Sequence, residues 1–226
     1  GIIQNKLREH TLPNEPDFHV VRAGDTVKLG VFSVEFIRVN HSIADACCLA
    51  IGTPVGMVIH TGDFKLDTSP IEGEMMNIAR LGELGNKGVK LLMCESTNAE
   101  RPGLTASESK VGRTFATLFE RAGDRRIIAA TFSSNVHRIQ QFITMAERYG
   151  RKVVVSGRSM ENVTAKAIEL GYLKVKPDTL VSIDDMRRIP DEHLAIVTTG
   201  SQGEPMSALT RMARGDHRKI SVTSHD

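Results

Sequence analysis

Short apolar runs separated by turn residues dominate the first part of the chain and predict β-strands. In VFSVEFIRV the apolar positions alternate imperfectly with polar ones, as expected for a strand with two different faces. The run VKLLMC is apolar except for Lys90, which predicts a buried strand. The predicted strands cover residues 31–39, 47–52, 57–62 and 89–94. One amphipathic helix is predicted over residues 74–85, with Gly85 closing its end.

From about residue 105 the pattern changes to segments with helical periodicity that alternate with short apolar strands. In the segment 107–123, Val111, Phe115 and Leu118 form the apolar stripe. Helices are predicted over 107–123, 135–150, 159–171 and 205–215, and strands over 126–132, 152–157, 194–200 and from 219. This alternation predicts a parallel sheet with crossover helices. The expected fold class is α/β, in two parts: residues 1–104, mainly strand, and residues 105–226.

The segment VIHTGDFKLD raises the question of why an apolar strand ends on an acid. Gly62 and Asp63 are favoured in turns, since glycine accepts positive φ and aspartate hydrogen-bonds its own backbone. His41 and Glu95 also follow predicted strands, and a His, an Asp and a Glu together form a ligand set compatible with zinc or manganese. No HxH, HxxH or HExxH motif is present, so turn residues and an isolated structural histidine remain the alternative.

Three loops of the second part, TFSSNVHR, SGRSMEN and TTGSQGEP, each lie between an apolar strand and a helix. In a parallel sheet they share the carboxyl edge, where helix N-termini bind anions. Arg138 and Arg158 add guanidinium groups that match phosphate. The neutral donors are Ser133, Ser134, Asn135, Ser159, Ser201 and Gln202, and Gly157, Gly200 and Gly203 permit close approach of a ligand. Serine and asparagine are also the usual N-caps, so each loop alone fits a structural role.

Composition narrows the function classes only in part. The chain has 226 residues, of which 40% are hydrophobic and 25% charged, as in ordinary globular proteins. Its net charge of +2 does not by itself indicate nucleic-acid binding, so any polyanion site must be local. With 4% aromatic residues and no Trp, backbone contacts would dominate over base stacking. Three cysteines without a CxxC pair, and no apolar run of membrane-spanning length, favour a reducing cytoplasm.

Six sequence blocks, in their order and spacing, closely resemble the bacterial ribonuclease J family. These blocks are NHSIAD, HTGDFKLD, ESTN, RIIAATFSSNVHRIQQ, VSGRSMEN and TTGSQGEPMSAL. The family belongs to the metallo-β-lactamase superfamily, in its β-CASP branch of nucleases, and the resemblance covers nearly the whole chain. It implies that residues 1–104 are part of a metallo-β-lactamase sheet. Residues 105–226 would then be most of a β-CASP domain, with a parallel sheet flanked by helices.

The resemblance also implies roles for single residues near a metal centre. His41 matches a histidine that binds one zinc ion, and Asp63 matches an aspartate that bridges two zinc ions. Glu95 matches the acidic residue that opens the β-CASP motifs and is thought to orient or share a proton near the metals. Asp63 and Glu95 are therefore the candidate catalytic residues, and His41 and Asp63 the candidate ligands.

The loops at 133–138, 158–159 and 200–204 match segments that line the RNA path and the pocket for a 5′-monophosphate. His137 and Glu204 thereby join the candidate residues, with His137 as an RNA or structural contact rather than a metal ligand. The implied partner is single-stranded, 5′-monophosphorylated RNA, with no membrane. The resemblance further implies a homo- or hetero-oligomer.

The implied activity is metal-dependent hydrolysis of RNA, by 5′-to-3′ exonuclease and endonuclease action, in mRNA decay and rRNA maturation. Two zinc ions, with manganese or magnesium as alternatives, would activate a shared water. The family's HxHxDH motif, which supplies four ligands, and its later histidines are absent from this chain. Because a catalytic zinc normally has three protein ligands, we expect the chain alone to bind zinc weakly and to show little or no nuclease activity.

Two other functions stay open. The first is a non-catalytic paralogue that binds RNA as a subunit of a ribonuclease J complex, which a parent gene without HxHxDH would favour. The second is an α/β enzyme that binds a phosphorylated metabolite at the edge of its sheet. Titration with RNAs of increasing length separates the second from RNA binding, because a mononucleotide binder gains nothing from a longer strand.

Overall fold

The computed structural model is a mixed α/β structure, described for residues 16–71, 74–224 and 226 together with Ile3 and Leu7. It has two compact parts, called here the N-terminal unit (Pro13–Ser109) and the C-terminal unit (from Lys110 to Asp226). The sequence predicted a boundary after residue 104. Among the described residues no helix combines the length and apolar character needed to cross a membrane.

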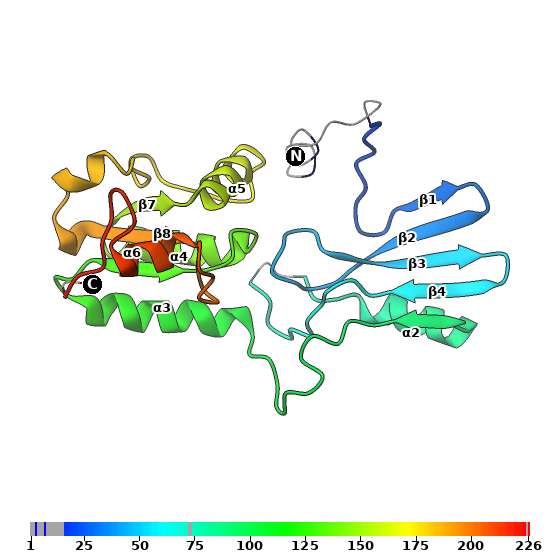
Figure 1. Ribbon diagram of the computed structural model, residues 1–226. Helices are drawn as coiled ribbons and strands as arrows, with labels where there is room; N and C mark the ends of the chain where they lie inside the picture. Colours follow the sequence, from blue (N-terminus) through cyan, green and yellow to red (C-terminus); the bar gives the residue numbers. More distant parts are fainter. Residues whose placement is uncertain (1–2, 4–6, 8–15, 72–73, 225) are drawn as a thin grey trace. The chain divides into compact units, whose positions relative to one another are not determined.

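The N-terminal unit is built on one sheet, in which the five strands of its described residues follow one another in chain order. The strands are β1 (Thr26–Leu29), β2 (Phe32–Arg38), β3 (Cys47–Thr53), β4 (Gly56–His60) and β5 (Leu91–Met93). Neighbours are antiparallel up to β4, and β5 joins β4 in parallel after a crossover through helix α2 (Ile78–Lys87). Figure 1 shows these strands side by side, with α2 beside β4 and β5.

One face of this sheet carries the core of the N-terminal unit. Ile37 of β2 pairs with Cys48 of β3, and Ala50 of β3 pairs with Ile59 of β4, so that these buried side chains point to the same face. Leu84 of α2 packs in the same cluster and is 3% exposed. The helix therefore covers the face on which the most buried residues of the sheet lie.

The structure corrects three predictions in this unit. Helix α2 begins at Ile78 and continues to Lys87, where Gly88 caps it, so Gly85 does not close its end. Strand β5 was expected to be buried, yet each of its residues is exposed, because its side chains are left uncovered by the described part of the chain. Strand β1 was not predicted.

The C-terminal unit holds a second sheet, whose described strands lie in the order β6-β8-β7 and are all parallel. The strands are β6 (Ile127–Ala130), β7 (Lys152–Ser156) and β8 (Leu194–Thr198). The α-helices are α3 (Glu108–Ala122), α4 (Val136–Arg148), α5 (Arg158–Glu169) and α6 (Ala208–Arg214), and two short 3-10 helices are η1 (Asp185–Arg188) and η2 (Asp191–His193). The predicted parallel sheet with crossover helices is confirmed.

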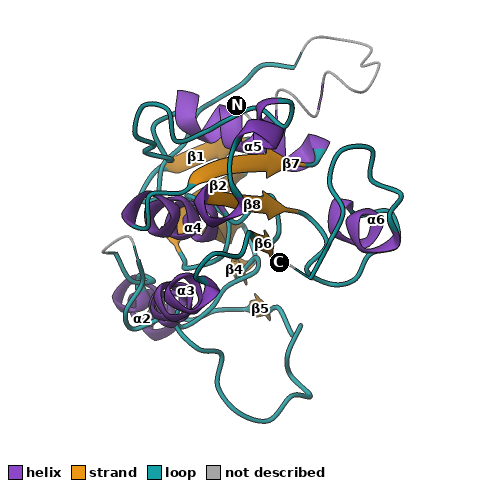
Figure 2. Ribbon diagram, turned by 90° about the vertical axis from the view of Figure 1, so that its left-hand side faces the viewer, coloured by secondary structure: helices purple, strands orange, loops and turns teal. Residues whose placement is uncertain are grey.

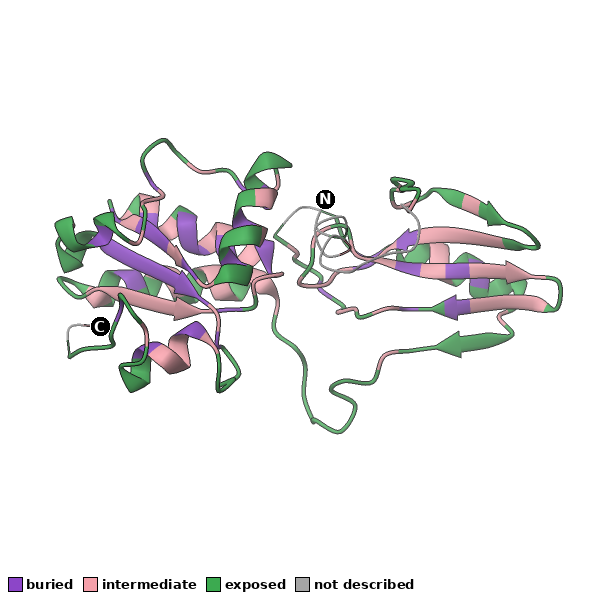
Figure 3. Ribbon diagram, turned by 45° about the horizontal axis from the view of Figure 1, so that its top comes forward, coloured by how far each residue is buried: buried purple, intermediate pink, exposed green. Residues whose placement is uncertain are grey.

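The two faces of this sheet are covered by different helices. Helices α3, α4 and α5 pack in one cluster with Val153, Ala195 and Val197. Helix α6 and η1 pack in another cluster with Val154 and Ile196, whose side chains point the other way. Figure 2 shows α4 and α6 on opposite sides of β7 and β8, and in Figure 3 the buried colour concentrates in the strands of this unit.

Two further predictions for the C-terminal unit were wrong in detail. In α3 the buried residue is Phe119, at 2% exposure, whereas Leu118 is 51% exposed. The apolar stripe therefore runs through Phe115 and Phe119, which both stack edge-on against Phe142 of α4. No strand forms over residues 219–222, where Ile220 is instead buried against the α6 side of the sheet.

Candidate functional site

His41, Asp63 and Glu95 follow strands β2, β4 and β5, which run in the same direction. Strand β3 is antiparallel to both β2 and β4, and β5 is parallel to β4. The carboxyl ends of β2, β4 and β5 therefore lie at the same end of the sheet, called its edge below. His41 Nε2 lies 3.7 Å from Asp63 Oδ2, and the side chains are 32% and 71% exposed. The structure thus brings the two candidate metal ligands together at an open edge.

The turn that carries Asp63 depends on Gly62. This glycine has φ of +58°, a left-handed conformation that glycine adopts without strain. Its N–H donates to Nδ1 of His60 at 3.1 Å. The chain therefore turns directly at the strand end and leaves the Asp63 carboxylate exposed.

Glu95 lies on the neighbouring loop and is held by its own hydrogen bonds. Its Oε2 accepts the Thr97 N–H at 2.8 Å, and its N–H donates to Thr61 Oγ1 at 3.1 Å. The bonds from Thr97, above all that from its N–H, and the nearby His41 hold the pKa of Glu95 below its usual value. Glu95 is therefore ionised at neutral pH and adds a negative charge beside His41.

Two residues that were not predicted fix the geometry of this edge. Thr61 is buried, donates its hydroxyl to the Gly62 carbonyl at 2.8 Å and accepts from Glu95, so it joins the loops after β4 and β5. The carbonyl of Asn40 accepts the Lys65 N–H at 2.7 Å, which joins the loops after β2 and β4. Neither residue belongs to a type that sequence alone marks as functional, because their role depends on which strands are neighbours.

Side-chain bonds of Asn40 extend this framework to the start of α2. Its Oδ1 accepts the Met76 N–H at 2.8 Å, and its amide donates to the Glu74 carbonyl at 3.0 Å. Further along the same loop, the buried carboxylate of Asp67 accepts the Glu108 N–H at 3.1 Å. The loops that carry His41 and Asp63 are thus held in place by hydrogen bonds to neighbouring segments.

An imidazole nitrogen and a carboxylate are donors that zinc accepts, and each binds the ion at about 2.0–2.2 Å. The separation of 3.7 Å between His41 Nε2 and Asp63 Oδ2 therefore lets both reach one ion. Among the described residues, however, no group of three or more His, Cys, Asp or Glu side chains is arranged to hold a metal. Two donors fit a zinc ion, and the described residues do not complete its coordination.

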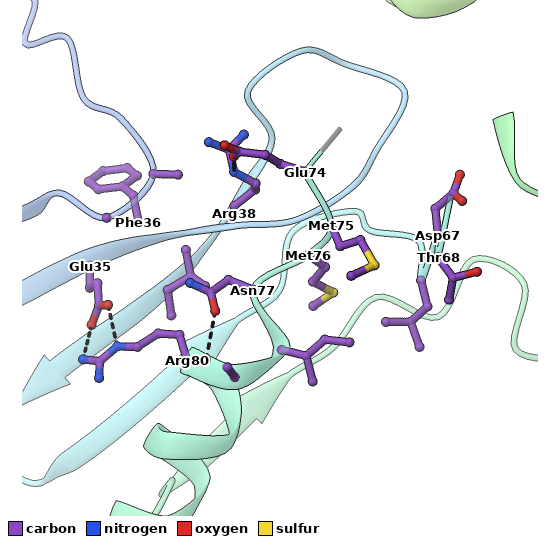
Figure 4. A pocket seen from close by; sticks show the side chains of 16 residues that line it. Glu35, Phe36, Arg38, Asp67, Thr68, Glu74, Met75, Met76, Asn77 and Arg80 are labelled. Carbon is purple, nitrogen blue, oxygen red and sulfur yellow. Dashed lines mark hydrogen bonds and ion pairs between the residues drawn. The ribbon is translucent and has the colours of Figure 1, made fainter. Parts of the chain in front are cut away.

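A pocket of about 580 Å³ lies elsewhere in the N-terminal unit, between β2 and the start of α2. Figure 4 shows its charged side chains, where Arg80 binds both carboxylate oxygens of Glu35 at 2.7 and 2.9 Å. Arg38 likewise pairs with Glu74 at 2.6 Å. Its lining includes none of the three residues at the strand ends, and its arginines are already neutralised, so it is not the candidate site.

In the C-terminal unit, the three polar loops emerge at one edge of the parallel sheet. The register pairs Ala130 of β6 and Ser156 of β7 with the same residue of β8, Thr198. All three strands therefore end at the same level, and the loops that follow them lie next to one another. This arrangement is the one that the strand–loop–helix pattern predicted.

Direct contacts join these loops. Ser133 Oγ lies 2.7 Å from Ser159 Oγ, which connects the loop after β6 with the start of α5. A Cβ atom on Gly157 would lie 3.3 Å from Thr199 Oγ1, so the loops after β7 and β8 also approach closely. Gly157 has φ of +112° and is the N-cap of α5, so the N-cap has no side chain to cap the helix. The Glu161 carboxylate accepts the Gly157 N–H at 3.1 Å, and the N–H groups of the first turn itself remain without a cap. The first turn of α5 therefore presents N–H groups that can donate hydrogen bonds to a bound anion.

Some candidate residues also have structural partners. Asn135 is 1% exposed, and its Oδ1 caps α4 by accepting the Arg138 N–H at 3.1 Å. Gly200 is buried, with φ of +116°, and a Cβ there would lie 2.4 Å from Ser207 Oγ. Helix capping therefore explains Asn135, and close packing explains Gly200, without any contact to a ligand.

The remaining candidates are more open to solvent. Ser201, Gln202, Gly203 and Glu204 form an exposed turn, in which Gln202 donates its N–H to Glu204 Oε2 at 3.2 Å. Arg158 is exposed at the start of α5, and Ser134, His137 and Arg138 are half-buried. Sequence reasoning missed Thr131, whose buried hydroxyl at the end of β6 has no hydrogen-bond partner among the described residues.

Comparison with known proteins shows that the chain is similar to ribonuclease J proteins. The family model described as "Ribonuclease J, beta-CASP domain" matches residues 124–226. Over the whole chain, the sequence is 44% identical to proteins named Ribonuclease J from Synechocystis and Mycolicibacterium smegmatis, and 42% identical to one from Thermus thermophilus. The chain spans 35%, 40% and 39% of the length of these three relatives.

A solved structure supports the fold. The crystal structure of a protein of unknown function from Enterococcus faecalis matches with a TM-score of 0.58 at 21% sequence identity. The match covers 81% of this chain and 45% of that one. At this identity the likeness concerns the arrangement of the strands and helices.

Proposed function

Because this chain belongs to the ribonuclease J family, we propose that the whole protein of which it forms part is a metal-dependent RNA hydrolase. Its action would be 5′-to-3′ exonucleolytic and endonucleolytic, on single-stranded RNA in mRNA decay and rRNA maturation. The three free cysteines among the described residues agree with the reducing cytoplasm in which such RNAs occur.

The junction of the loops after β6 and β7 is the observation that carries this proposal. The Ser133–Ser159 contact of 2.7 Å places two hydroxyls next to the N-terminus of α5, where the N-cap is a glycine and Glu161 accepts only the Gly157 N–H. Arg158 begins that helix and is exposed. Hydroxyls, free N–H groups and a guanidinium are the groups that bind a phosphate, so a 5′-monophosphate or a backbone phosphate fits this junction.

His41 and Asp63 would be the part of the metal-binding set that this chain supplies. When bound, such ions lower the pKa of a coordinated water and neutralise charge on the phosphate oxygens. Asp63 is exposed enough to reach an ion, and its loop is fixed through Thr61 and Asn40. Glu95, which is ionised at neutral pH, would itself serve as a proton acceptor beside the reacting phosphate.

The proposal predicts that Asp63→Ala in the full-length protein abolishes metal binding and RNA cleavage while the fold is kept, because the residue lies exposed on a turn. Metal content and hydrolysis of 5′-monophosphorylated RNA measure these effects, and circular dichroism checks the fold. Asp124→Ala, at an exposed turn of the C-terminal unit, is the matched control. Full activity of the Asp63 variant would refute its role, and a wild-type protein that cleaves no RNA with zinc or manganese would refute the proposed function.

The 226-residue chain by itself should behave differently. Since its described residues supply two metal donors where a catalytic zinc takes three, we expect weak zinc binding and little or no cleavage. RNA binding through the loops of the C-terminal unit should remain. Chelator-sensitive cleavage by this chain would contradict the expectation.

A further inference from the structure

Positive charge is concentrated in one short segment of the C-terminal unit. Residues 205–219 hold four basic side chains and one acid, whereas the net charge of the whole chain is only +2. The rest of the chain therefore has a slight net negative charge. Such a local excess of positive charge would attract a polyanion to this part of an otherwise nearly neutral protein.

The fold adds two arginines of η1 to this segment. Met186 of η1, Met212 of α6 and Ile220 are buried in one cluster on the same side of the sheet. Lys219 also forms an ion pair with Asp184, directly before η1. The name basic face is used below for these six residues: Arg187, Arg188, Arg211, Arg214, Arg218 and Lys219.

Local roles explain only part of this surface. Arg211 and Arg214 lie in the last turn of α6, where cations stabilise the helix dipole. Arg188 pairs with Asp185 at 3.4 Å. Arg187, Arg214 and Arg218 are exposed, and none of them has a carboxylate within ion-pairing distance in the described part of the chain. Three arginines therefore remain available to an external anion.

The basic face is continuous with the candidate phosphate site. His217, the residue before Arg218, has its Nε2 3.5 Å from Ser156 Oγ, at the end of β7. Ser156 is followed directly by Gly157 and Arg158, the start of α5. A polymer with a phosphate at that helix start therefore meets Arg218 first, and the η1 arginines of the basic face lie further away, before the amino end of β8.

We propose that the basic face is a second RNA-binding surface, which holds the phosphate backbone of the strand beyond the phosphate bound at the start of α5. This inference rests on the proposed function. The face offers guanidinium groups and no exposed aromatic ring, so it would bind backbone rather than bases and show no sequence preference. RNA is the class of partner that supplies regularly spaced negative charges to such a surface.

The proposal gives a quantitative expectation for salt dependence. On single strands, each neutralised phosphate adds about −0.7 to the slope of log K against log salt. Three lost contacts should lower the magnitude of the slope by about 2 and weaken binding roughly 50-fold at about 0.15 M salt. A 5′-monophosphorylated dinucleotide, which fills only the phosphate site, should bind equally well before and after the change.

The test compares the full chain with a variant that carries Arg187→Gln, Arg214→Gln and Arg218→Gln. Binding of a dinucleotide and of a longer single-stranded RNA is measured by fluorescence anisotropy over a range of salt, in EDTA to prevent cleavage. The matched control replaces Arg113, Arg121 and Arg125 by Gln, which removes the same charge from exposed positions on α3 and the turn after it. A Lys version of the basic-face variant keeps the charge and should restore the slope.

The outcomes separate the inference from the proposed function. A weaker, less salt-dependent complex with the longer RNA, seen only in the basic-face variant, supports the second surface. Equal losses in both Gln variants, or no loss in either, overturn it while RNA binding itself stands. If the unmodified chain binds neither the dinucleotide nor the longer RNA, the proposed function falls together with the inference.

Discussion

Arg151 offers the sharpest test of how the C-terminal unit is held together. Its side chain is 4% exposed, and its guanidinium donates to four backbone carbonyls rather than to a carboxylate. The two shortest bonds reach Arg125 at 2.7 Å and Gly123 at 2.8 Å, and the others reach Leu194 at 3.1 Å and Asp191 at 3.3 Å. The residue thus ties the approach to β6, the start of β7 and the start of β8 to one another.

Replacing this residue by methionine keeps the buried stem and removes the donors. A hydrogen bond to a charged group contributes about 1.5–3 kcal/mol net, so the two short bonds together contribute about 3–6 kcal/mol. Keeping the guanidinium out of water costs several kcal/mol, and burial lowers the pKa of Arg151 for the same reason. The variant would also leave carbonyls unpaired, at about 1–3 kcal/mol each. We expect Arg151→Met to lose about 3 kcal/mol, or roughly 10 °C of melting temperature.

Thermal unfolding followed by circular dichroism measures the loss, and hydrogen exchange of the β7 and β8 amides locates it. Arg125→Met is the matched control, because the side chain of Arg125 is exposed and only its backbone carbonyl takes part in the network. The control should change stability by less than about 0.5 kcal/mol. If Arg151→Met were as stable as the unchanged protein, the cost of burying the guanidinium would equal or exceed its bonds, and the reasoning would be wrong.

Two further predictions concern pH and a glycine. The bidentate bond from Arg80 lowers the pKa of Glu35, so the pair stabilises the fold above the usual carboxyl pKa and this stability disappears as pH falls through the lowered value. Unfolding measured from neutral to acid pH should show this loss, and Glu35→Gln should flatten the profile; an unchanged profile would contradict it. Gly200→Ala should destabilise the unit by about 2–3 kcal/mol, because its positive φ is strained for alanine and the Cβ would clash with Ser207. Gly203→Ala, with positive φ but open space around it, should cost about 1 kcal/mol in the same denaturant titration, and equal losses would show that the clash is unimportant.

The sequence pattern was a reliable guide where burial alone decides the structure. The helix predicted over residues 135–150 forms as α4, and Val136, Ile139, Ile143 and Ala146, which recur at helical spacing, are all buried, because α4 lies against the sheet. The pattern failed for residues 89–94, where an apolar run predicted burial and the strand lies exposed at an edge. Apolar character indicates which residues favour burial, whereas the helices and loops that pack on a strand decide which of them are buried: β7 is also an edge strand, yet it is buried under packed helices.

The caps and turns were harder to predict. The end of α2 was placed at Gly85, but the next two residues continue the helix, and Gly88 caps it with a φ of +95°, a conformation that favours glycine. Both glycines suit a helix end, and only the backbone conformation distinguishes them. Likewise, Asn135 was a candidate RNA contact and its side chain serves as the cap of α4, two roles that require the same residue type.

The two candidate sites differ in how far topology alone could have predicted them. In the C-terminal unit, alternation of strands and helices implies parallel strands, and parallel strands bring the loops that follow them to one edge. In the N-terminal unit, His41 and Asp63 meet only because a single antiparallel strand, β3, separates β2 from β4. Had the chain formed one more or one fewer strand between them, the two side chains would lie at opposite edges of the sheet. The count of strands between candidate ligands, together with the crossover through α2 that brings Glu95 to the same edge, therefore decides whether they can share a site.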